Sequence, residues 1–408
     1  MSRNVLQKMG DLRVKHFLLL LLISFYAYSV HGQDQEVEVN FYGKKHKLNY
    51  DVTMLNYPMY ENNDSKFYKY YYNYMDGLPY QFLLNDILKI STERKLNDYL
   101  YYQLIETVSN TILEQEKKQP NRVLFSWFLL AKSNFDVRLE LFKRKLTLHV
   151  KTDERVYGCQ QARAPGGMLY VDLTYFDNDL NYDKYTPLRA SYRPVTEGRP
   201  FDFTFTELPE VFDTSSIPKE IAFKYNEQDY KVAYRVDTNY IRFLNDYPEI
   251  GVAEHCVLPV SKACENTLIK WFKEQTKNFT DEEACRFILS FVRTGFEHID
   301  DEKKMGQGNR KIFALEESLY HQFTDTEERT IIFNTLVRKV VGQRAVVLSS
   351  MKNYNAAVNI EKRIEHPIQY EEENFVVCDI NDQEDKLNIG EFRSEAEARK
   401  RYKIYEIK

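Results

Sequence analysis

The chain of 408 residues carries a formal net charge of −5 at pH 7, with 43% apolar and 29% charged residues. That length and apolar content are enough for two or three hydrophobic cores. The acidic balance gives no reason to expect a nucleic-acid partner. The five cysteines include no C-x-x-C pair and the eight histidines are scattered, so the sequence predicts no metal and no cofactor.

The first 32 residues have the three parts of a secretory signal. A basic stretch is followed by an apolar run from Phe17 to Tyr28 and by the small-residue cleavage pattern Val30-His31-Gly32. A membrane anchor is the alternative, but a bilayer-spanning helix needs about 20 apolar residues. We therefore expect cleavage near Gly32, no transmembrane segment after it, and a periplasmic or extracellular protein.

Two clusters leave alternatives open. Cys256 and Cys264 are close enough in sequence for a local disulfide, or each is a buried apolar side chain. The tyrosine-rich stretch Phe67–Tyr74 is either a binding platform or, as we favour, a packing surface of a strand or helix with its hydroxyls in water.

Residues 33–185 are predicted to form an N-terminal α+β domain. Alternation around Gly43 predicts a hairpin over Val37–Asp51, and apolar spacings of three and four predict helices over Leu83–Glu116 and Asn121–Ser133. Strands are expected over Val137–Val150 and Met168–Leu173.

Five prolines between Tyr185 and Lys219 mark a domain boundary, so residues 186–262 are interpreted as a proline-rich linker and a β-rich segment. Strand-like alternation runs over Ile221–Leu258. Residues 263–390 then form the last domain, which opens with helices over Cys264–Lys277 and Asp281–Phe296, the second capped by Thr280. Residues 391–408 are a charged tail, expected to be a solvated helix.

Four short segments occur in an informative order in the last domain. An apolar helix end with Phe291-Val292-Arg293 is followed by a loop with Asp300-Asp301-Glu302, by Leu315-Glu316-Glu317, and by Thr324-Asp325-Thr326-Glu327-Glu328-Arg329 ahead of another apolar helix. In this order the chain resembles the secreted bacterial transglutaminase-like (papain-like) family over about 100 residues. The resemblance implies an α+β fold with a helix packed on an antiparallel sheet, preceded by the β-rich segment and the N-terminal helix-and-sheet domain.

The family's catalytic triad consists of a Cys at a helix N-terminus, a His and an Asp. Its thiolate attacks an amide carbonyl, and the Asp orients the imidazole. In this sequence the matching positions are Thr326 for the nucleophile, Asn353 for the His and Asp379 for the Asp, so the triad is degenerate and predicted to be inactive. Thr326 is better suited to starting a helix. His321 and Cys378 are candidates for a displaced site, although Cys378 must face the core if Asp379 faces the cleft.

The first half contains an echo of the same order. Arg122 and Asp172 are separated by as many residues as Arg329 and Asp379, which either reflects a degenerate transglutaminase-like repeat or recurs by chance in an α+β protein. The function hypothesis is an exported pseudoenzyme that binds or scaffolds a peptide, peptidoglycan or envelope protein. A divergent cysteine or threonine amidase, protease or transamidase is the alternative, and a purely structural envelope protein is a third.

Overall fold

The computed structural model describes residues 34–59, 64–114, 119–142, 145–176, 186–187, 192–195, 197–299, 311–350 and 353–407. The expected signal segment and the loop with Asp300-Asp301-Glu302 lie outside these ranges. In the described ranges helices alternate with antiparallel sheets, so the α+β class is confirmed. No helix in the same ranges is long and apolar enough to cross a membrane.

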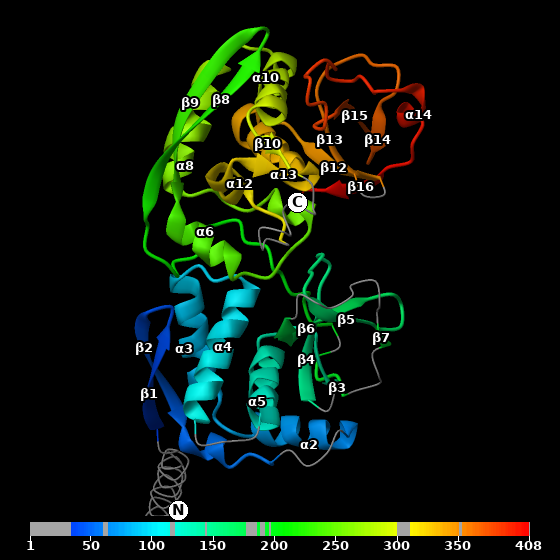
Figure 1. The fold of residues 1–408 in the computed structure, drawn as a ribbon. Helices are drawn as coiled ribbons and strands as arrows, with labels where there is room; N and C mark the ends of the chain where they lie inside the picture. The colour runs from blue at the N-terminus through cyan, green and yellow to red at the C-terminus, as the bar shows by residue number, and fades with distance from the viewer. Residues whose placement is uncertain are drawn as a thin grey trace, which may run out of the picture.

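The first half begins with a hairpin, continues with helices and ends with a sheet (Figure 1). Its elements are β1 (Asp34–Phe41), β2 (Lys44–Asp51), η1 (Val52–Leu55), α2 (Ser65–Asp76), α3 (Gln81–Glu93), α4 (Asp98–Ile112), α5 (Gln119–Lys132), β3 (Val137–Phe142), β4 (Lys145–Lys151), β5 (Cys159–Arg163), β6 (Leu169–Phe176) and β7 (Thr186–Pro187).

The second half repeats this succession of hairpin, helices and sheet. Its elements are β8 (Ser216–Tyr225), β9 (Gln228–Asp237), α6 (Thr238–Asn245), α7 (Val252–His255), α8 (Lys262–Cys264), η2 (Glu265–Ile269), α9 (Lys270–Gln275), α10 (Asp281–Thr294), β10 (Glu297–His298), α12 (Leu315–His321), β11 (Phe323–Thr324), α13 (Thr326–Leu336), η3 (Val337–Val341), β12 (Ala345–Ser350), β13 (Asn353–Val358), β14 (Ile368–Tyr370), β15 (Glu373–Cys378), α14 (Glu395–Ala398) and β16 (Lys403–Glu406).

The two sheets share one strand topology. The order is β3-β4-β6-β5 in the first half and β12-β13-β15-β14 in the second, and every one of these neighbours is antiparallel. In both sheets the third strand in sequence lies outside the fourth. Each sheet has one further edge strand, β7 beside β5 and β16 beside β12. The echo in the sequence therefore has a counterpart in the topology, while common descent of the halves stays a prediction.

Local signals in the sequence predicted several elements well. The turn of the first hairpin is Tyr42-Gly43, both with positive φ, and its strands pair antiparallel on either side of it, as the hairpin around Gly43 predicts. Thr280 caps α10 in a capping box with Glu283. The tyrosine-rich stretch is helix α2, which buries Tyr68 and Tyr71 against the core. The expectation that its hydroxyls face water is wrong for Tyr71, whose hydroxyl is buried without a partner among the described residues.

Two expectations are wrong in whole or in part because tertiary contacts override the local pattern. The strand alternation expected to continue to Leu258 stops at Asp237, whose carboxylate accepts from the amides of Asn239 and Tyr240 and starts α6. The charged tail is an exposed helix only over α14, Glu395–Ala398, because β16 then pairs with β12 and extends the second sheet. Of the two alternatives for Cys256 and Cys264, the buried side chain is the one observed: all five cysteines are free thiols and all are buried.

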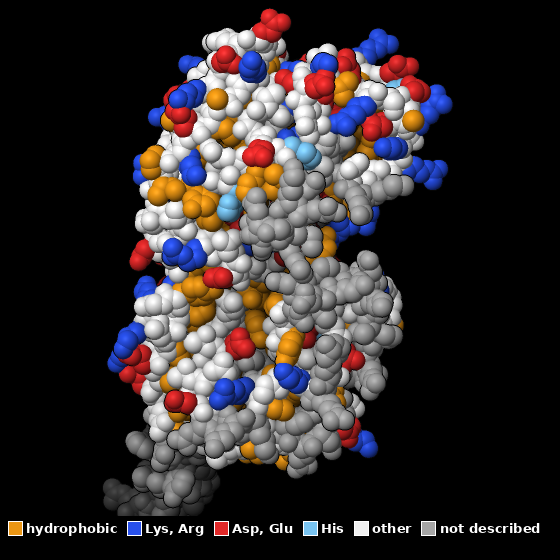
Figure 2. Space-filling model, in the orientation of Figure 1, with side chains coloured by type: hydrophobic (Ala, Val, Ile, Leu, Met, Phe, Trp, Pro, Cys, Tyr) orange, Lys and Arg blue, Asp and Glu red, His pale blue; other side chains and the backbone are white. Residues whose placement is uncertain are grey.

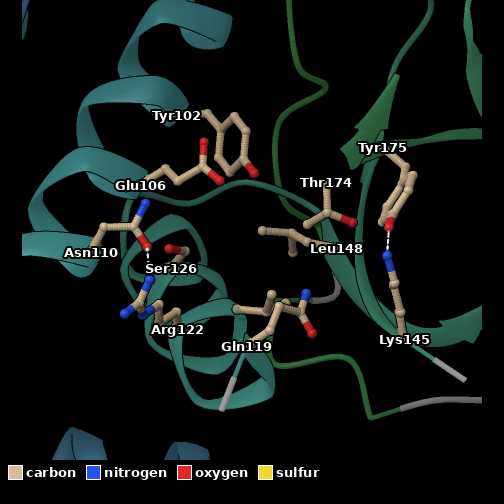
Figure 3. A pocket seen from close by; sticks show the side chains of 11 residues that line it. Tyr102, Glu106, Asn110, Gln119, Arg122, Ser126, Lys145, Leu148, Thr174 and Tyr175 are labelled. Carbon is tan, nitrogen blue, oxygen red and sulfur yellow. Dashed lines mark hydrogen bonds between the residues drawn. The ribbon is translucent and has the colours of Figure 1, made fainter. Parts of the chain in front are cut away.

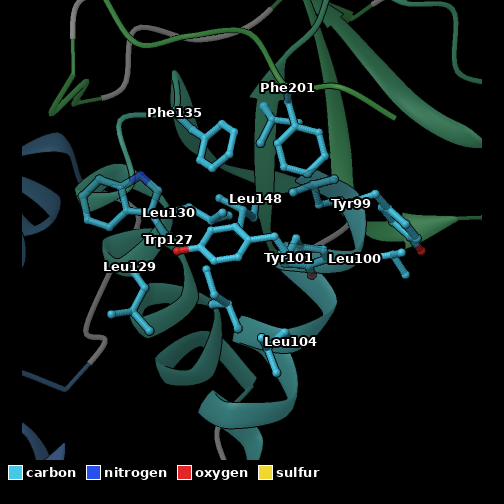
Figure 4. Packing of buried hydrophobic residues seen from close by; sticks show 14 of the residues in the cluster. Tyr99, Leu100, Tyr101, Leu104, Trp127, Leu129, Leu130, Phe135, Leu148 and Phe201 are labelled. Atoms are coloured by element: carbon cyan, nitrogen blue, oxygen red, sulfur yellow. The ribbon is translucent and has the colours of Figure 1, made fainter. Parts of the chain in front are cut away.

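The first sheet packs against α4 and α5 through large apolar side chains. Figure 4 shows Trp127 and Leu130 of α5 beside Leu148 of β4, with Phe135 and Phe201 stacked above them. Phe201 belongs to the irregular segment after the prolines, which is therefore part of the first core. The second core is built in the same way from β8, β9, α10, α13 and the second sheet.

A buried guanidinium joins the second sheet to α10. Arg293 has no exposed side-chain surface. It donates two hydrogen bonds to the backbone oxygen of Asp379, at 2.8 and 2.6 Å, and further bonds to the Asp385 carboxylate and the Leu387 carbonyl, each at 2.8 Å. Asp385 also accepts from Arg286 and Ser290. The loop after β15 is thus held on α10 by charge-assisted bonds.

Replacing this guanidinium should be costly. In Arg293→Met the Asp385 carboxylate keeps Arg286 and Ser290 but loses one charged donor, and the Asp379 and Leu387 carbonyls lose their Arg293 donors, so we expect the free energy of unfolding to fall by about 3–5 kcal/mol. Urea unfolding followed by circular dichroism measures the loss. Lys231→Met, which removes an exposed ion pair with Glu220, should cost less than about 1 kcal/mol. Equal losses in the two variants would contradict the role assigned to Arg293.

Candidate functional site

Thr326 is the first residue of α13, and its neighbour Asp325 is the N-cap. The Asp325 carboxylate accepts from the amides of Glu327 and Glu328 at 2.9 and 3.3 Å, and the Glu328 carboxylate accepts from the Asp325 amide at 3.0 Å. The Thr326 hydroxyl donates to the Glu327 carboxylate at 3.2 Å. The hydroxyl at this helix start is therefore engaged with a carboxylate, which is not the imidazole that would activate a nucleophile.

Asp379 follows β15 and is held by a different cation from the one expected in a triad. Its carboxylate accepts from Arg393 at 2.7 and 3.1 Å and from the Asn381 amide at 2.9 Å. The side chain is 5% exposed. Asp379 is thus a structural anchor for the loop that leads to the tail.

The alternation of side chains along β13 and β15 places Asn353 and Asp379 on the face of the sheet away from α13. Ala356, Val358, Val376 and Cys378 pack in the core with α10 and α13. Ala357, Phe375 and Val377 pack in a separate cluster on the opposite face of the sheet. Because Asn353 and Asp379 share the alternation of Ala357 and Val377, their side chains lie on the face opposite the helices. Thr326 is not brought onto that face.

The residue opposite Asp379 is Asn355. One step beyond the pair Ala356↔Cys378, the register of β13 and β15 sets Asn355 against Asp379, and Asn381 donates to both the Asn355 side chain, at 3.1 Å, and the Tyr354 carbonyl, at 2.9 Å. Asn353 lies two residues away, exposed, opposite Ser350 at the hairpin end. The assignment of Thr326, Asn353 and Asp379 to triad positions stays a prediction.

No cysteine is poised as a nucleophile. Burial raises the pKa of the Cys378 thiol to about 12 and raises the pKa values of Cys159, Cys256, Cys264 and Cys285 as well. A thiol with so high a pKa carries almost no thiolate at neutral pH. His321 stacks on Phe313, with ring centroids 4.8 Å apart, so it is packed as an aromatic side chain.

A segment of the first half packs beside the second sheet. The Tyr157 amide donates to the Glu249 carbonyl at 2.8 Å, and the Arg155 amide donates to the Glu254 carboxylate at 3.1 Å. The Arg155 guanidinium lies 3.8 Å from the ring centroid of Tyr405 on β16. Tyr354 is part of the same cluster, and burial raises the pKa of its phenol while Arg155 opposes that rise. The junction of the halves is therefore ordered by polar contacts.

The first sheet has a histidine opposite an aspartate. His149 of β4 pairs directly with Asp172 of β6, and both are fully buried. His149 Nε2 is 3.0 Å from the Thr147 hydroxyl. One oxygen of Asp172 accepts from the amide and hydroxyl of Thr174 at 2.8 and 2.6 Å, and the other oxygen has no partner among the described residues. If Asp172 and Asp379 correspond, His149 corresponds to Asn355.

Burial disfavours the charged form of both side chains. It lowers the pKa of His149 to about 3 and raises the pKa of Asp172 to about 7. Sequence reasoning noticed Asp172 but missed His149. The stretch from Leu146 to Val150 alternates between apolar and polar residues, which predicts a strand with one face in solvent. The alternation does not reveal that Thr147 and His149, on the polar face, are buried as well.

A pocket of about 460 Å³ opens in the first half between α4, α5 and the hairpin edge of the sheet. Figure 3 shows Glu106 and Asn110 of α4 facing Arg122 of α5, with Lys145 and Tyr175 across the opening. Arg122 donates to the Asn110 side chain at 3.4 Å and Lys145 donates to the Tyr175 hydroxyl. Apart from Arg122, none of these residues stands out in the sequence, because they come together only when the helices pack on the sheet.

A second pocket of about 450 Å³ lies at the junction of the halves. Two of its cations are paired with carboxylates, Lys339 with Glu265 and Arg344 with Glu371, Glu373 and Glu406. The third, Arg338, donates to the Cys256 carbonyl at 2.9 Å. Within the described ranges no group of three or more His, Cys, Asp and Glu side chains could hold a metal ion. No family model, no curated protein and no solved structure matches this chain.

Substitution separates the contributions of Asp325 and Thr326 to the stability of the start of α13. Asp325→Ala removes the acceptor for two helix amides, so we expect a loss of about 1–2 kcal/mol in the free energy of unfolding. Thr326→Ala removes only a hydroxyl bonded to Glu327 and should cost less than about 0.5 kcal/mol. Urea unfolding of both variants checks the order. The reverse order would make Thr326 the residue on which the helix start depends.

Asp172 should make stability depend on pH. Its folded pKa of about 7 lies above the ordinary 3.8, so its contribution is fully present below about pH 3.8 and is lost as pH rises through about 7. Asp172→Asn keeps the acceptor for Thr174 and cannot ionise. The free energy of unfolding of the wild type should therefore fall relative to that of the variant as pH rises, by about 1.4 kcal/mol for each tenfold fall in proton concentration between those two pKa values.

Urea unfolding at several values between about pH 4 and pH 8 measures this difference, because other titrating groups cancel between the two proteins. Parallel curves for the wild type and Asp172→Asn would show that folding does not raise the pKa of this carboxyl.

Proposed function

We propose that this is an exported, catalytically inactive transglutaminase-like protein that acts as a binding or scaffolding module of the cell envelope. Its expected ligands are a peptide, peptidoglycan or an envelope protein. The proposal joins the resemblance of the motif order around Thr326 to the contacts at the corresponding positions. Export rests on the sequence of residues 1–32 alone.

The single observation that carries the loss of catalysis is the engagement of Asp379. Its carboxylate is bonded to Arg393 and Asn381, so it has a cation that takes the place of an imidazolium. At the helix start a Thr hydroxyl faces a carboxylate. Neither group is arranged to generate a nucleophile, and the loss of a triad nucleophile or base typically costs about 10⁴–10⁶ in rate.

A helix packed on an antiparallel sheet supports the resemblance at the level of architecture. In the second half α13 packs against β13 and β12, and α10 lies beside α13. This is the arrangement that the resemblance implies. It occurs in the first half as well, where α5 packs on β3 and β4, which favours a protein built of two related binding modules.

An activity assay of the chain beginning at Gln33 tests the proposal. We expect no incorporation of a fluorescent primary amine into a glutamine-bearing protein, and no release of ammonia from glutamine peptides, above the rate without protein. Thr326→Ala, Cys378→Ala and Asp379→Asn should leave that background unchanged. An active transglutaminase run in parallel shows that the assay detects turnover.

Turnover that disappears in Thr326→Ala, Cys378→Ala or Asp379→Asn would overturn the proposal and establish the divergent amidase, protease or transamidase. Circular dichroism of each variant separates a lost activity from a lost fold.

A further inference from the structure

We propose that the pocket between α4, α5 and the adjoining ends of β4 and β6 binds an amino acid or the end of a short peptide that carries both a free carboxylate and a free ammonium group. This inference goes beyond the proposed function, because it assigns a ligand chemistry to the first half and does not depend on the fate of the triad positions. A volume of about 460 Å³ is within the ordinary range of small-ligand pockets.

The cationic side of the pocket is formed by Lys145 and Arg122. Lys145 opens β4, is exposed, and donates to the Tyr175 phenol, whose ring centroid lies 4.6 Å from its ammonium nitrogen. Among the described residues no carboxylate pairs with Lys145. The Arg122 guanidinium donates to the carbonyls of Leu113 and Glu114 at 3.5 and 3.4 Å. The availability of a cation for the ligand carboxylate therefore rests on Lys145.

The anionic side is formed by Glu106 on the facing helix. Burial raises the pKa of this carboxyl, and among the described residues no cation offsets that rise. A ligand ammonium would supply the cation and stabilise the ionised form. Glu106 and Lys145 come from α4 and β4 on opposite walls (Figure 3), so a ligand with separated opposite charges can contact both.

The floor between the charges is apolar or neutral. Tyr102, Leu148 and Ser126 are buried, and the Ser126 hydroxyl is already bonded to Ser109 at 3.0 Å. Such a floor suits a small side chain or a peptide backbone rather than another charge. Gln119, whose amide donates to the Leu146 carbonyl at 3.0 Å, fixes the hairpin edge beside Lys145.

The second pocket does not have this property. Its cations Lys339 and Arg344 are each within 4 Å of a carboxylate of the same chain, so a ligand anion at either one would have to displace a partner. Its third cation, Arg338, already donates to the Cys256 carbonyl at 2.9 Å. In the first pocket Glu106 and Lys145 lie on separate walls, and within the described part of the chain the charge of Lys145 is met by a phenol rather than by a carboxylate. We therefore assign the ligand to the first pocket.

Three probes separate the two charges of the ligand: the dipeptide alanyl-alanine, the same dipeptide with an amidated C-terminus, and the N-acetylated dipeptide. Binding to the chain beginning at Gln33 is followed by ligand-observed NMR and calorimetry. We expect the free dipeptide to bind and each blocked form to bind at least tenfold more weakly. Lys145→Gln should abolish the difference between the free and amidated forms, and Glu106→Gln should abolish the difference between the free and acetylated forms.

Lys89→Gln and Glu93→Gln are matched controls, because these exposed side chains lie on α3 outside the pocket, and both should bind like the wild type. Circular dichroism confirms the fold of every variant. Absence of dipeptide binding at about 10 mM, or equal binding by the wild type, Lys145→Gln and Glu106→Gln, overturns the inference. Neither result bears on the amine-incorporation assay, so the two proposals fail separately.

Discussion

The second half depends on the burial of one guanidinium. Arg293 lies in the helix layer with no exposed surface and satisfies its donors with the end of β15 and the loop after it. A buried cation is tolerated only where carboxylates and carbonyls surround it, so this loop is fixed in place. The fixed loop in turn brings Arg393 to the Asp379 carboxylate. The same contacts that stabilise the sheet therefore also engage the Asp379 carboxylate.

The sheets of the two halves share one strand topology but carry different polar side chains. Each half has a helix on a sheet of order first-second-fourth-third. If Asp172 corresponds to Asp379, the cross-strand pair is His149 and Asp172 in the first sheet and Asn355 and Asp379 in the second. The first pair is buried and its charges are suppressed, whereas the second is bonded to Asn381 and Arg393. On the face of the molecule in Figure 2, acidic and basic side chains are interspersed among the described residues, so no single charge sign marks either half on that side.

Much of the fold could be predicted because its signals are local. Gly43 at a hairpin turn, Thr280 with Glu283 at a helix start and the apolar spacing of α4 each depend on a few neighbouring residues. The tail and α6 could not be predicted in the same way. Lys403–Glu406 become a strand only because β12 offers an open edge, and Asp237 ends β9 because its carboxylate caps the next helix. The strand Lys403–Glu406 thus depends on a partner strand that is distant in sequence. The end of β9 depends on a helix cap that the alternation of the strand does not reveal.

The candidate site was harder to predict than the fold, since a site depends on which way each side chain points. A motif match assigns Asn353 and Asp379 to positions along the chain, but a shift of one residue moves a side chain to the other face of a sheet. Only the register shows that Ala356 and Cys378 face α13. For the same reason no motif could reveal the pocket that joins Glu106 of α4 to Lys145 of β4, residues that line one cavity only after packing.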